Sequence, residues 1–302
     1  MIGPILAPGS RAGAQVMEKA VKGRSLWDDA RRRLFRNWAA VSGMLVLAVL
    51  VAVALIGPHL VPFSYDQINK NDVWAPPLTG GHLLGADSLG RDLLARLLMG
   101  LRVSLAIGLV ATMVSLAIGI VWGAVAGYVG GALDELMMRV VDVLYSLPFI
   151  FFVILLMVTF GSNIILIFIA IGAVEWLTMS RIVRGQTLGL KHKEFVEAAR
   201  AAGLRQGSII AKHIVPNLLG PVVVYVTLTI PAVILAESFL SFLGLGVQPP
   251  MASLGTLIAG GAQDMELAPW LLIFPSLTMV VTLMSFNFIG DGLRDAIDPK
   301  DR

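Results

Sequence analysis

Six apolar stretches, each long enough to cross a lipid bilayer, constrain this chain more than any other feature of its sequence. A spanning helix needs about 20 mostly apolar residues, because the hydrocarbon core is about 30 Å thick and each residue adds about 1.5 Å. Hydrophobic residues make up 57% of the chain and charged residues 14%, a balance that calls for lipid as the solvent. The pattern predicts an all-α membrane protein with six transmembrane helices. We expect them at 38–56, within 103–133, and at 138–160, 164–182, 214–236 and 267–290.

The distribution of lysine and arginine predicts how the chain is oriented in the membrane. With six spans, both chain ends lie on one side, and nineteen Lys and Arg residues fall on that side against four on the other. Cytoplasmic segments carry the excess of positive charge in membrane proteins. We therefore expect a cytoplasmic N-terminal segment at 1–37, a six-helix membrane domain at 38–290 and a cytoplasmic tail at 291–302. The domain contains one long cytoplasmic loop, at 184–213, and we expect no cleaved signal peptide before the first span.

Residue types and motifs exclude several kinds of chemistry. The chain has no cysteine, and its four histidines are scattered without metal-ligand spacing, so we expect no metal site. No phosphate-binding loop with the glycine and lysine of an ATPase occurs, so we expect neither nucleotide binding nor enzymatic activity in this chain. The net charge of +3 follows from the positive loops and does not indicate a nucleic-acid surface.

The loop at 184–213 contains a short amphipathic helix, which we place at 193–202. Alanines leave one part of its surface with little bulk, and charged side chains surround them: Ala198, Ala199, Ala201, Ala202, Glu194, Glu197 and Arg200. Gly203 suits the left-handed residue that ends a helix, and Ser208 suits the cap of the next one. A solvated surface helix and a helix that docks on a partner protein both fit these residues.

Two carboxylates fall within or beside predicted spans. Glu175 lies inside the span at 164–182, where a charge costs a few kcal/mol unless it faces a cavity or a partner. We favour an inward-facing structural pair or gate over direct contact with a substrate. Glu237 lies at the outer end of the span at 214–236, where we favour a position among the lipid headgroups over one facing a path through the protein.

Two local features complete the residue-level reading. The segment at 88–99 alternates leucines with charged residues, which predicts a separate helix lying in the membrane interface. Arg139 and Asp142 are one turn apart, which predicts an ion pair at the membrane boundary.

The cytoplasmic loop also resembles a known signature. Glu197-Ala198-Ala199, followed by Gly203 and then by Pro216, is similar to the loop of ATP-binding-cassette (ABC) importer permeases. In this chain His213 and Val215 stand where that signature usually has isoleucine and leucine.

The resemblance extends over nearly the whole chain. Residues 84–92, with Ala86 in place of the usual threonine, and residues 238–250 resemble external segments of the dipeptide, oligopeptide and nickel group of these permeases. The terminal stretches 23–33 and 286–302 resemble most the C-type oligopeptide permeases of Gram-negative bacteria.

This resemblance implies a fold, a set of partners and a site. The fold would be that of a type I ABC importer permease in the bacterial inner (plasma) membrane. The partners would be a homologous permease, two ATP-binding subunits and a periplasmic peptide-binding protein, with ATP and Mg bound by the partners and no cofactor in this chain. The loop that docks on an ATPase would comprise Glu194, Glu197, Ala198, Ala199, Arg200, Gly203 and Pro216, with Glu175 and Glu237 as candidates for the path or gate. Oligopeptides are the implied substrate, and dipeptides, glutathione, nickel complexes and cationic peptides are alternatives, because their permeases share these loops.

Two other functional classes deserve comparison with this one. In a proton-coupled secondary transporter, Glu175 and Glu237 would carry protons, but such folds usually contain internal repeats, and we find none in the sequence. An intramembrane protease would need a serine and histidine or paired aspartates within its spans, and the sequence does not offer them. Neither class is favoured.

Overall fold

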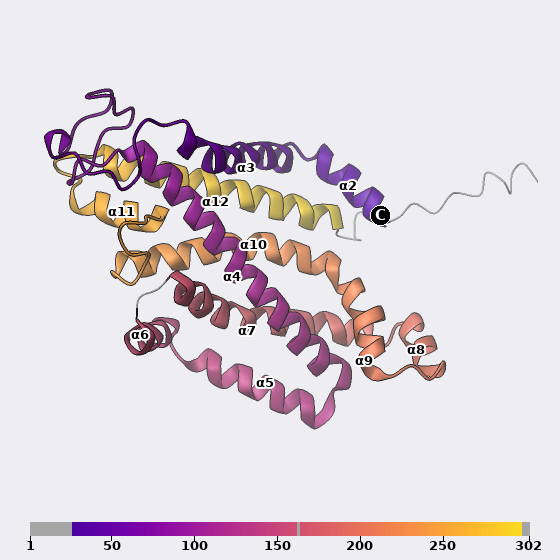
Figure 1. The fold of residues 1–302 in the computed structure, drawn as a ribbon. Coiled ribbons are helices and arrows are strands. Elements are labelled where there is room, and N and C mark those ends of the chain that lie inside the picture. Colours follow the sequence, from indigo (N-terminus) through magenta and orange to yellow (C-terminus); the bar gives the residue numbers. More distant parts are fainter. Residues whose placement is uncertain (1–25, 162–163, 298–302) are drawn as a thin grey trace, which may run out of the picture.

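The computed structural model describes residues 26–161 and 164–297 of the chain, and every named element among them is helical (Figure 1). The prediction of an all-α membrane protein is confirmed. Within these described ranges, five helices are each long and apolar enough to cross a membrane, and a bent pair gives a sixth span if its two parts are counted as one. The five are α3 (Trp38–Ile56), α4 (Leu93–Val129), α7 (Ile164–Leu190), α10 (Val215–Phe242) and α12 (Trp270–Ile297).

Shorter helices join and flank these spans. They are α2 (Leu26–Arg36), η1 (Gly57–His59), η2 (Lys70–Asp72), α5 (Gly131–Ser146), α6 (Phe149–Phe160), α8 (Glu194–Ala201), α9 (Gln206–Ile209), η3 (Ile210–Ile214) and α11 (Leu254–Gln263). In Figure 1, α8 and α9 lie at one end of the bundle, and α11 lies at the opposite end with the long loop that follows α3. The two ends therefore differ in character, one helical and one rich in loops.

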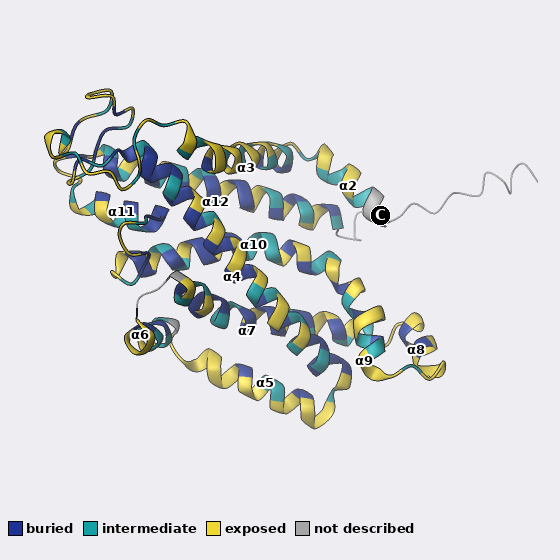
Figure 2. Cartoon of the chain, in the orientation of Figure 1, coloured by how far each residue is buried: buried dark blue, intermediate teal, exposed yellow. Residues whose placement is uncertain are grey.

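Helix α3 forms where the sequence predicts a span, with the same bounds. The Asn37 side chain caps it by accepting hydrogen bonds from the backbone N–H groups of Ala39 (3.0 Å) and Ala40 (3.2 Å). Gly43 lies so close to α12 that an added Cβ would be 2.8 Å from the Ser285 carbonyl oxygen. Most of α3 stays exposed in the isolated chain (Figure 2), as expected for a helix that faces lipid.

Helix α4 crosses the centre of the molecule and packs most extensively on α7 (Figure 1). Small residues make this possible: a Cβ at Gly123 would lie 2.4 Å from the Ser180 carbonyl oxygen, so only glycine permits the approach. The prediction of a separate interfacial helix at 88–99 is wrong. Asp92 caps α4 by accepting from the N–H of Ala95 at 2.7 Å, and the helix then runs unbroken from Leu93. Leu93, Leu97 and Leu98, which the prediction placed toward lipid, are buried against the protein.

The third predicted span, at 138–160, is not one continuous helix. Helices α5 and α6 meet at a bend of 82°. Leu147 is extended because the ring of Pro148 disfavours a helical residue before it, and Pro148 has no N–H to continue the ladder. The predicted Arg139–Asp142 pair is also wrong, since Asp142 pairs with Arg181 of α7 at 2.7 Å. Helix α5 lies along one side of the molecule, and most of its residues are exposed (Figure 2).

Several helices extend beyond the predicted spans. Helix α7 continues to Leu190, into the predicted loop, and α12 continues to Ile297, into the predicted tail. Helices α9, η3 and α10 follow one another without interruption, so a 37-residue helical rod runs from Gln206 to Phe242. Such a rod is about 55 Å long, well beyond the hydrocarbon core of about 30 Å. Hydropathy marks where the membrane is crossed and does not mark where a helix ends.

Candidate functional site

Helix α8 ends in a well-defined turn. The N–H of Gly203 donates to the Arg200 carbonyl at 3.0 Å, and the N–H of Leu204 donates to the Ala199 carbonyl at 3.2 Å. These two bonds form a Schellman motif, and Gly203 has the positive φ, +77°, that the motif requires. The predicted helix end is confirmed. Ser208 does not cap the next helix, because α9 begins earlier, at Gln206 after Arg205.

The inner face of α8 is anchored in the protein. Val196 is fully buried and Ala199 is 6% exposed, and both belong to an apolar cluster with Ile209, Ile214 and residues of α4, α7 and α10. The Arg200 guanidinium lies over the ring of Tyr128 of α4, 5.7 Å from its centre. Ala199 therefore packs α8 against the rest of this chain, and the prediction that it belongs to the docking surface is wrong.

The outer face of α8 combines small and charged side chains at the end of the bundle. Its exposed residues include Glu194, Phe195, Glu197, Ala198, Ala201 and Ala202. Of the predicted docking residues, Glu194, Glu197 and Ala198 thus lie on one accessible surface, and Arg200 is exposed beside them. A small, partly acidic helix face whose other face is rigidly buried can fit closely into a partner's groove.

The chain then passes from this helix into a span through a wide turn. Residues Ile210–Ile214 are π-helical, with the N–H of Val215 donating to the Ile210 carbonyl. Pro216 is the second residue of α10 and directly follows the π turn. Helix α9, the π turn and α10 are continuous, and α8 packs against them in one apolar cluster.

A two-point ion pair holds α5 near the same end. Arg184 of α7 donates to both carboxylate oxygens of Asp134, from Nε at 2.5 Å and from Nη2 at 2.7 Å. The Trp122 indole N–H of α4 also donates to the Met137 carbonyl at 3.2 Å. Otherwise α5 buries only Asp134 and Val141. The Asp134–Arg184 pair was not anticipated from the sequence, because fifty residues separate its members.

Glu175 lines a pocket beside the bend between α5 and α6. The pocket has a volume of about 520 Å³ and is lined mainly by apolar residues of α5, α6 and α7, together with Tyr145 and Thr178. Arg181 of α7 lies 4.4 Å from the centre of the Tyr145 ring of α5 while it pairs with Asp142. Glu175 therefore faces a cavity, in agreement with the expectation for a carboxylate within a span.

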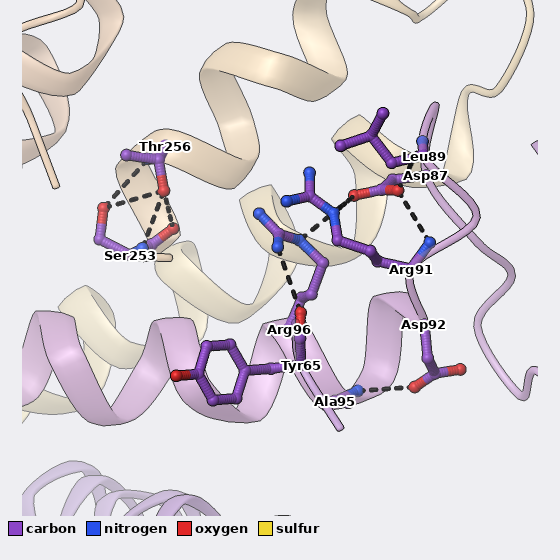
Figure 3. Close-up of polar contacts among 9 residues, drawn as sticks. All are labelled: Tyr65, Asp87, Leu89, Arg91, Asp92, Ala95, Arg96, Ser253 and Thr256. Carbon is purple, nitrogen blue, oxygen red and sulfur yellow. Dashed lines mark hydrogen bonds and ion pairs between the residues drawn. The ribbon is translucent and has the colours of Figure 1, made fainter. Parts of the chain in front are cut away.

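Glu237 lies inside the packed protein. Its side chain is fully buried, and its Oε1 accepts hydrogen bonds from Ser241 Oγ (2.6 Å) and Ser253 Oγ (2.7 Å). Within the described residues, its Oε2 has no hydrogen-bond partner. Ser253 also caps α11 in a capping box with Thr256 (Figure 3). Glu237 thus connects α10 to α11 and does not lie among the lipid headgroups.

The loop-rich end is held by a compact polar network (Figure 3). Asp87 accepts from the Arg91 Nε at 2.8 Å and from the Arg96 Nε at 3.3 Å, and Arg96 also donates to the Tyr65 carbonyl. Gly90 permits this fold of the loop, since an added Cβ would lie 1.7 Å from the Asn69 carbonyl oxygen. The segment at 84–92, which resembles an external segment of the permeases, is therefore part of an ordered cap on this end.

Comparisons with known proteins agree with this geometry. Residues 119–302 match the family described as the binding-protein-dependent transport system inner membrane component, and residues 25–77 match the N-terminal transmembrane domain of oligopeptide transport permease C. The oligopeptide transport system permease protein OppC of Haemophilus influenzae is 55% identical over 95% of this chain and 93% of its own length. The dipeptide transport system permease protein DppC of Bacillus subtilis is 44% identical over 92% of this chain and 87% of its own length.

A solved structure extends the comparison to the fold. The inward-facing MetNI methionine ABC transporter contains a chain that matches 68% of this one and 96% of its own length, with a TM-score of 0.55 and 19% identity. The predicted type I importer permease fold is thereby confirmed. The chain belongs to the family of binding-protein-dependent transport system inner membrane components.

Proposed function

We propose that this chain is the permease subunit of an ATP-driven importer, and that it forms a path for oligopeptides across the bacterial inner membrane with a homologous permease. The observation that supports this most directly is α8, a helix anchored on one face, exposed on the other and joined rigidly to a span. Oligopeptides are favoured as the substrate because the oligopeptide permeases of Haemophilus influenzae and Escherichia coli are 55% identical to this chain. The two relatives from Bacillus subtilis, an oligopeptide permease at 42% and a dipeptide permease at 44%, do not separate the two substrates.

In this proposal α8 docks on one of two partner ATPases, which bind ATP and Mg and hydrolyse the nucleotide. Glu194, Glu197 and Ala198 contact the ATPase groove, and Gly203 fixes the angle at which the chain leaves it. Closure of the ATPase pair then moves α8, and the rod from Gln206 to Phe242 transmits that movement to the membrane.

Two carboxylates have different roles in the proposal. Glu175 lines the path or its gate, because it faces a cavity between helices that are loosely packed. Glu237 holds α10 to α11 and so positions the outer end of the path. The ordered cap at the loop-rich end faces the external peptide-binding protein.

The proposed orientation places both termini and α8 in the cytoplasm, as the charge distribution predicts. Alkaline phosphatase is active only outside the cytoplasm, so a fusion after Arg205 should be inactive and one after Lys70 should be active. The reverse pattern would contradict the orientation.

The function itself is tested by reconstituting the complete complex in proteoliposomes. Labelled oligopeptides should accumulate only with ATP and the binding protein, faster than dipeptides, and a protonophore should leave the rate unchanged. If a protonophore abolishes uptake while ATP is present, the chain works as a secondary transporter and the proposal fails.

A further inference from the structure

A polar pocket of about 290 Å³ lies at the loop-rich end of the bundle, between the start of α4, the loop after α10 and helix α11. The charged side chains in its lining are Asp87, Arg91, Arg96 and Asp264. The two arginines lie next to each other, because both pair with Asp87 Oδ2, from Arg91 Nε at 2.8 Å and from Arg96 Nε at 3.3 Å (Figure 3). Their side chains are only 15% and 9% exposed, so the surrounding protein fixes their positions.

One carboxylate cannot neutralise both of these arginines. Asp87 Oδ1 already accepts the backbone N–H groups of Leu89 and Arg91, both at 2.9 Å, and its Oδ2 carries both ion pairs. Arg96 also donates from Nη1 to the Tyr65 carbonyl at 3.3 Å. Among the residues that the structure describes, neither Nη of Arg91 nor the Nη2 of Arg96 has a partner. One positive charge and three donor nitrogens are therefore left for an acceptor in the pocket.

The end of α11 adds two further polar groups to the same pocket. Gln263 and Asp264 line it, and within the described part of the chain their side chains make no hydrogen bond or ion pair. A side-chain amide can pair with a main-chain peptide group, and a carboxylate can accept from a main-chain N–H. Asp264 also repels a second negative charge, which favours a carboxylate over a phosphate dianion.

These groups together complement the end of a peptide chain. Guanidinium forks match a carboxylate in geometry and charge. The pocket volume equals that of about ten water molecules at about 30 Å³ each, which suits the end of a peptide and not a whole oligopeptide. An acidic side chain of a partner protein would meet the arginines but would leave Gln263 and Asp264 unpaired.

From these unpaired groups around one cavity, we propose that the pocket binds the free C-terminal end of a peptide. The peptide carboxylate lies against Arg91 and Arg96, and its last main-chain amide groups contact Gln263 and Asp264. The inference rests on the proposed oligopeptide substrate, and it adds a place in this chain where the carboxyl end of that substrate is held.

The test is equilibrium dialysis of the purified full-length chain in nanodiscs, without ATP, against radiolabelled trialanine or its C-terminal amide. The amide should bind about tenfold more weakly, because it lacks the carboxylate that the arginines contact. Arg91→Gln should weaken binding of trialanine about tenfold and remove most of the difference between the two peptides. The matched control is Arg102→Gln, which removes the same charge from an exposed position of α4 outside the pocket and should change binding less than twofold.

Gly260→Trp tests the cavity without changing its charge. Gly260 lines the pocket within α11, and an added Cβ there would meet nothing within 4 Å, so the larger side chain enters open space. This variant should keep the thermal unfolding midpoint of the parent and bind trialanine at least tenfold more weakly.

Three results would overturn the proposal. Equal binding of trialanine and its amide, or full binding by Gly260→Trp, would show that the peptide carboxylate is not held here. Displacement of trialanine by an equal concentration of inorganic phosphate would show a general anion site. Weaker docking of the external binding protein to a complex with Arg91→Gln, with trialanine binding unchanged, would show that the pocket takes a partner's side chain. Uptake of trialanine by the parental complex is measured separately, so that import together with equal binding of the two peptides refutes this inference alone.

Discussion

The turn at Gly203 offers the sharpest test of how α8 works, because its role depends on one backbone angle. Gly203 has φ +77°, and an added Cβ would meet no atom within 4 Å. A substitution therefore causes no clash, and its cost comes from the left-handed conformation alone. That cost is about 1 kcal/mol for alanine and about 2 kcal/mol for a β-branched residue.

In the proposed complex this strain changes the angle at which the chain leaves α8. A cost of about 2 kcal/mol lowers the population of the native turn about thirtyfold relative to competing conformations. With the turn, the hydrogen bonds from Gly203 and Leu204 to the end of α8 are lost. We expect Gly203→Val to reduce peptide uptake at least tenfold, and Gly203→Ala to reduce it less, while both chains still insert into the membrane.

Gly207 supplies a matched control in the same segment. An added Cβ there also meets nothing within 4 Å, but Gly207 lies within helix α9, where valine is no worse than glycine. The assay measures peptide uptake and ATP hydrolysis together in proteoliposomes of the complete complex. Gly207→Val should retain parental uptake, and Gly203→Val should hydrolyse ATP without transport or lose its ATPases. If Gly203→Val transports at the parental rate with the ATPases bound, α8 is only a connector.

Further variants test the packing, the ion pair and the cavity. Ala198→Trp should leave the chain folded but release the ATPases from the purified complex. Ala199→Trp, at a buried position, should instead lower the thermal unfolding midpoint of the chain, because overpacking costs about 1–3 kcal/mol. If the two variants behave alike, α8 does not have one buried and one exposed face. Asp134→Ala should lower the free energy of unfolding by about 1–2 kcal/mol, and a double variant in which Asp134 and Arg184 exchange residues should recover part of that stability in thermal unfolding. No loss of stability with Asp134→Ala would show that the pair is only a surface contact. Glu175→Gln should keep the complex assembled and reduce uptake less than Glu175→Arg; a larger loss with glutamine would point to a proton carrier.

The membrane-crossing segments and the end of α8 could be predicted because local rules determine them. The bounds of α3 follow from an uncharged run flanked by Asn37 and Gly57, and the turn at Gly203 follows from the preference of glycine for positive φ. Both depend on residues adjacent in sequence, so one sequence contains the necessary information.

The errors have the opposite origin, since each concerns a contact between distant segments. The leucines of 93–98 suit a lipid surface as well as a protein core, and only the packing of α4 decides between them. Asp142 has a cation one turn away, yet pairs with Arg181 because α5 lies along α7. The bend between α5 and α6 is an exception, because a local signal, the ring of Pro148, marks it. The split of the α8 alanines into a buried Ala199 and an exposed Ala198 likewise requires the position of the neighbouring helices.

The π-helical turn at Ile210–Ile214 sets the rotational phase of the rod that it interrupts. A π turn accommodates one more residue than an α turn, and one residue corresponds to about 100° of rotation about the axis. Every side chain of α10 is therefore offset by that angle from the orientation a plain helix after α9 would give it. The direction in which Glu237 points toward Ser253, at the start of α11, is set by this phase, whereas its bond to Ser241 lies within α10 itself. A single deletion within the π turn would preserve a helix of ordinary geometry and yet turn the whole span, which makes this short segment far less tolerant of length changes than of substitutions.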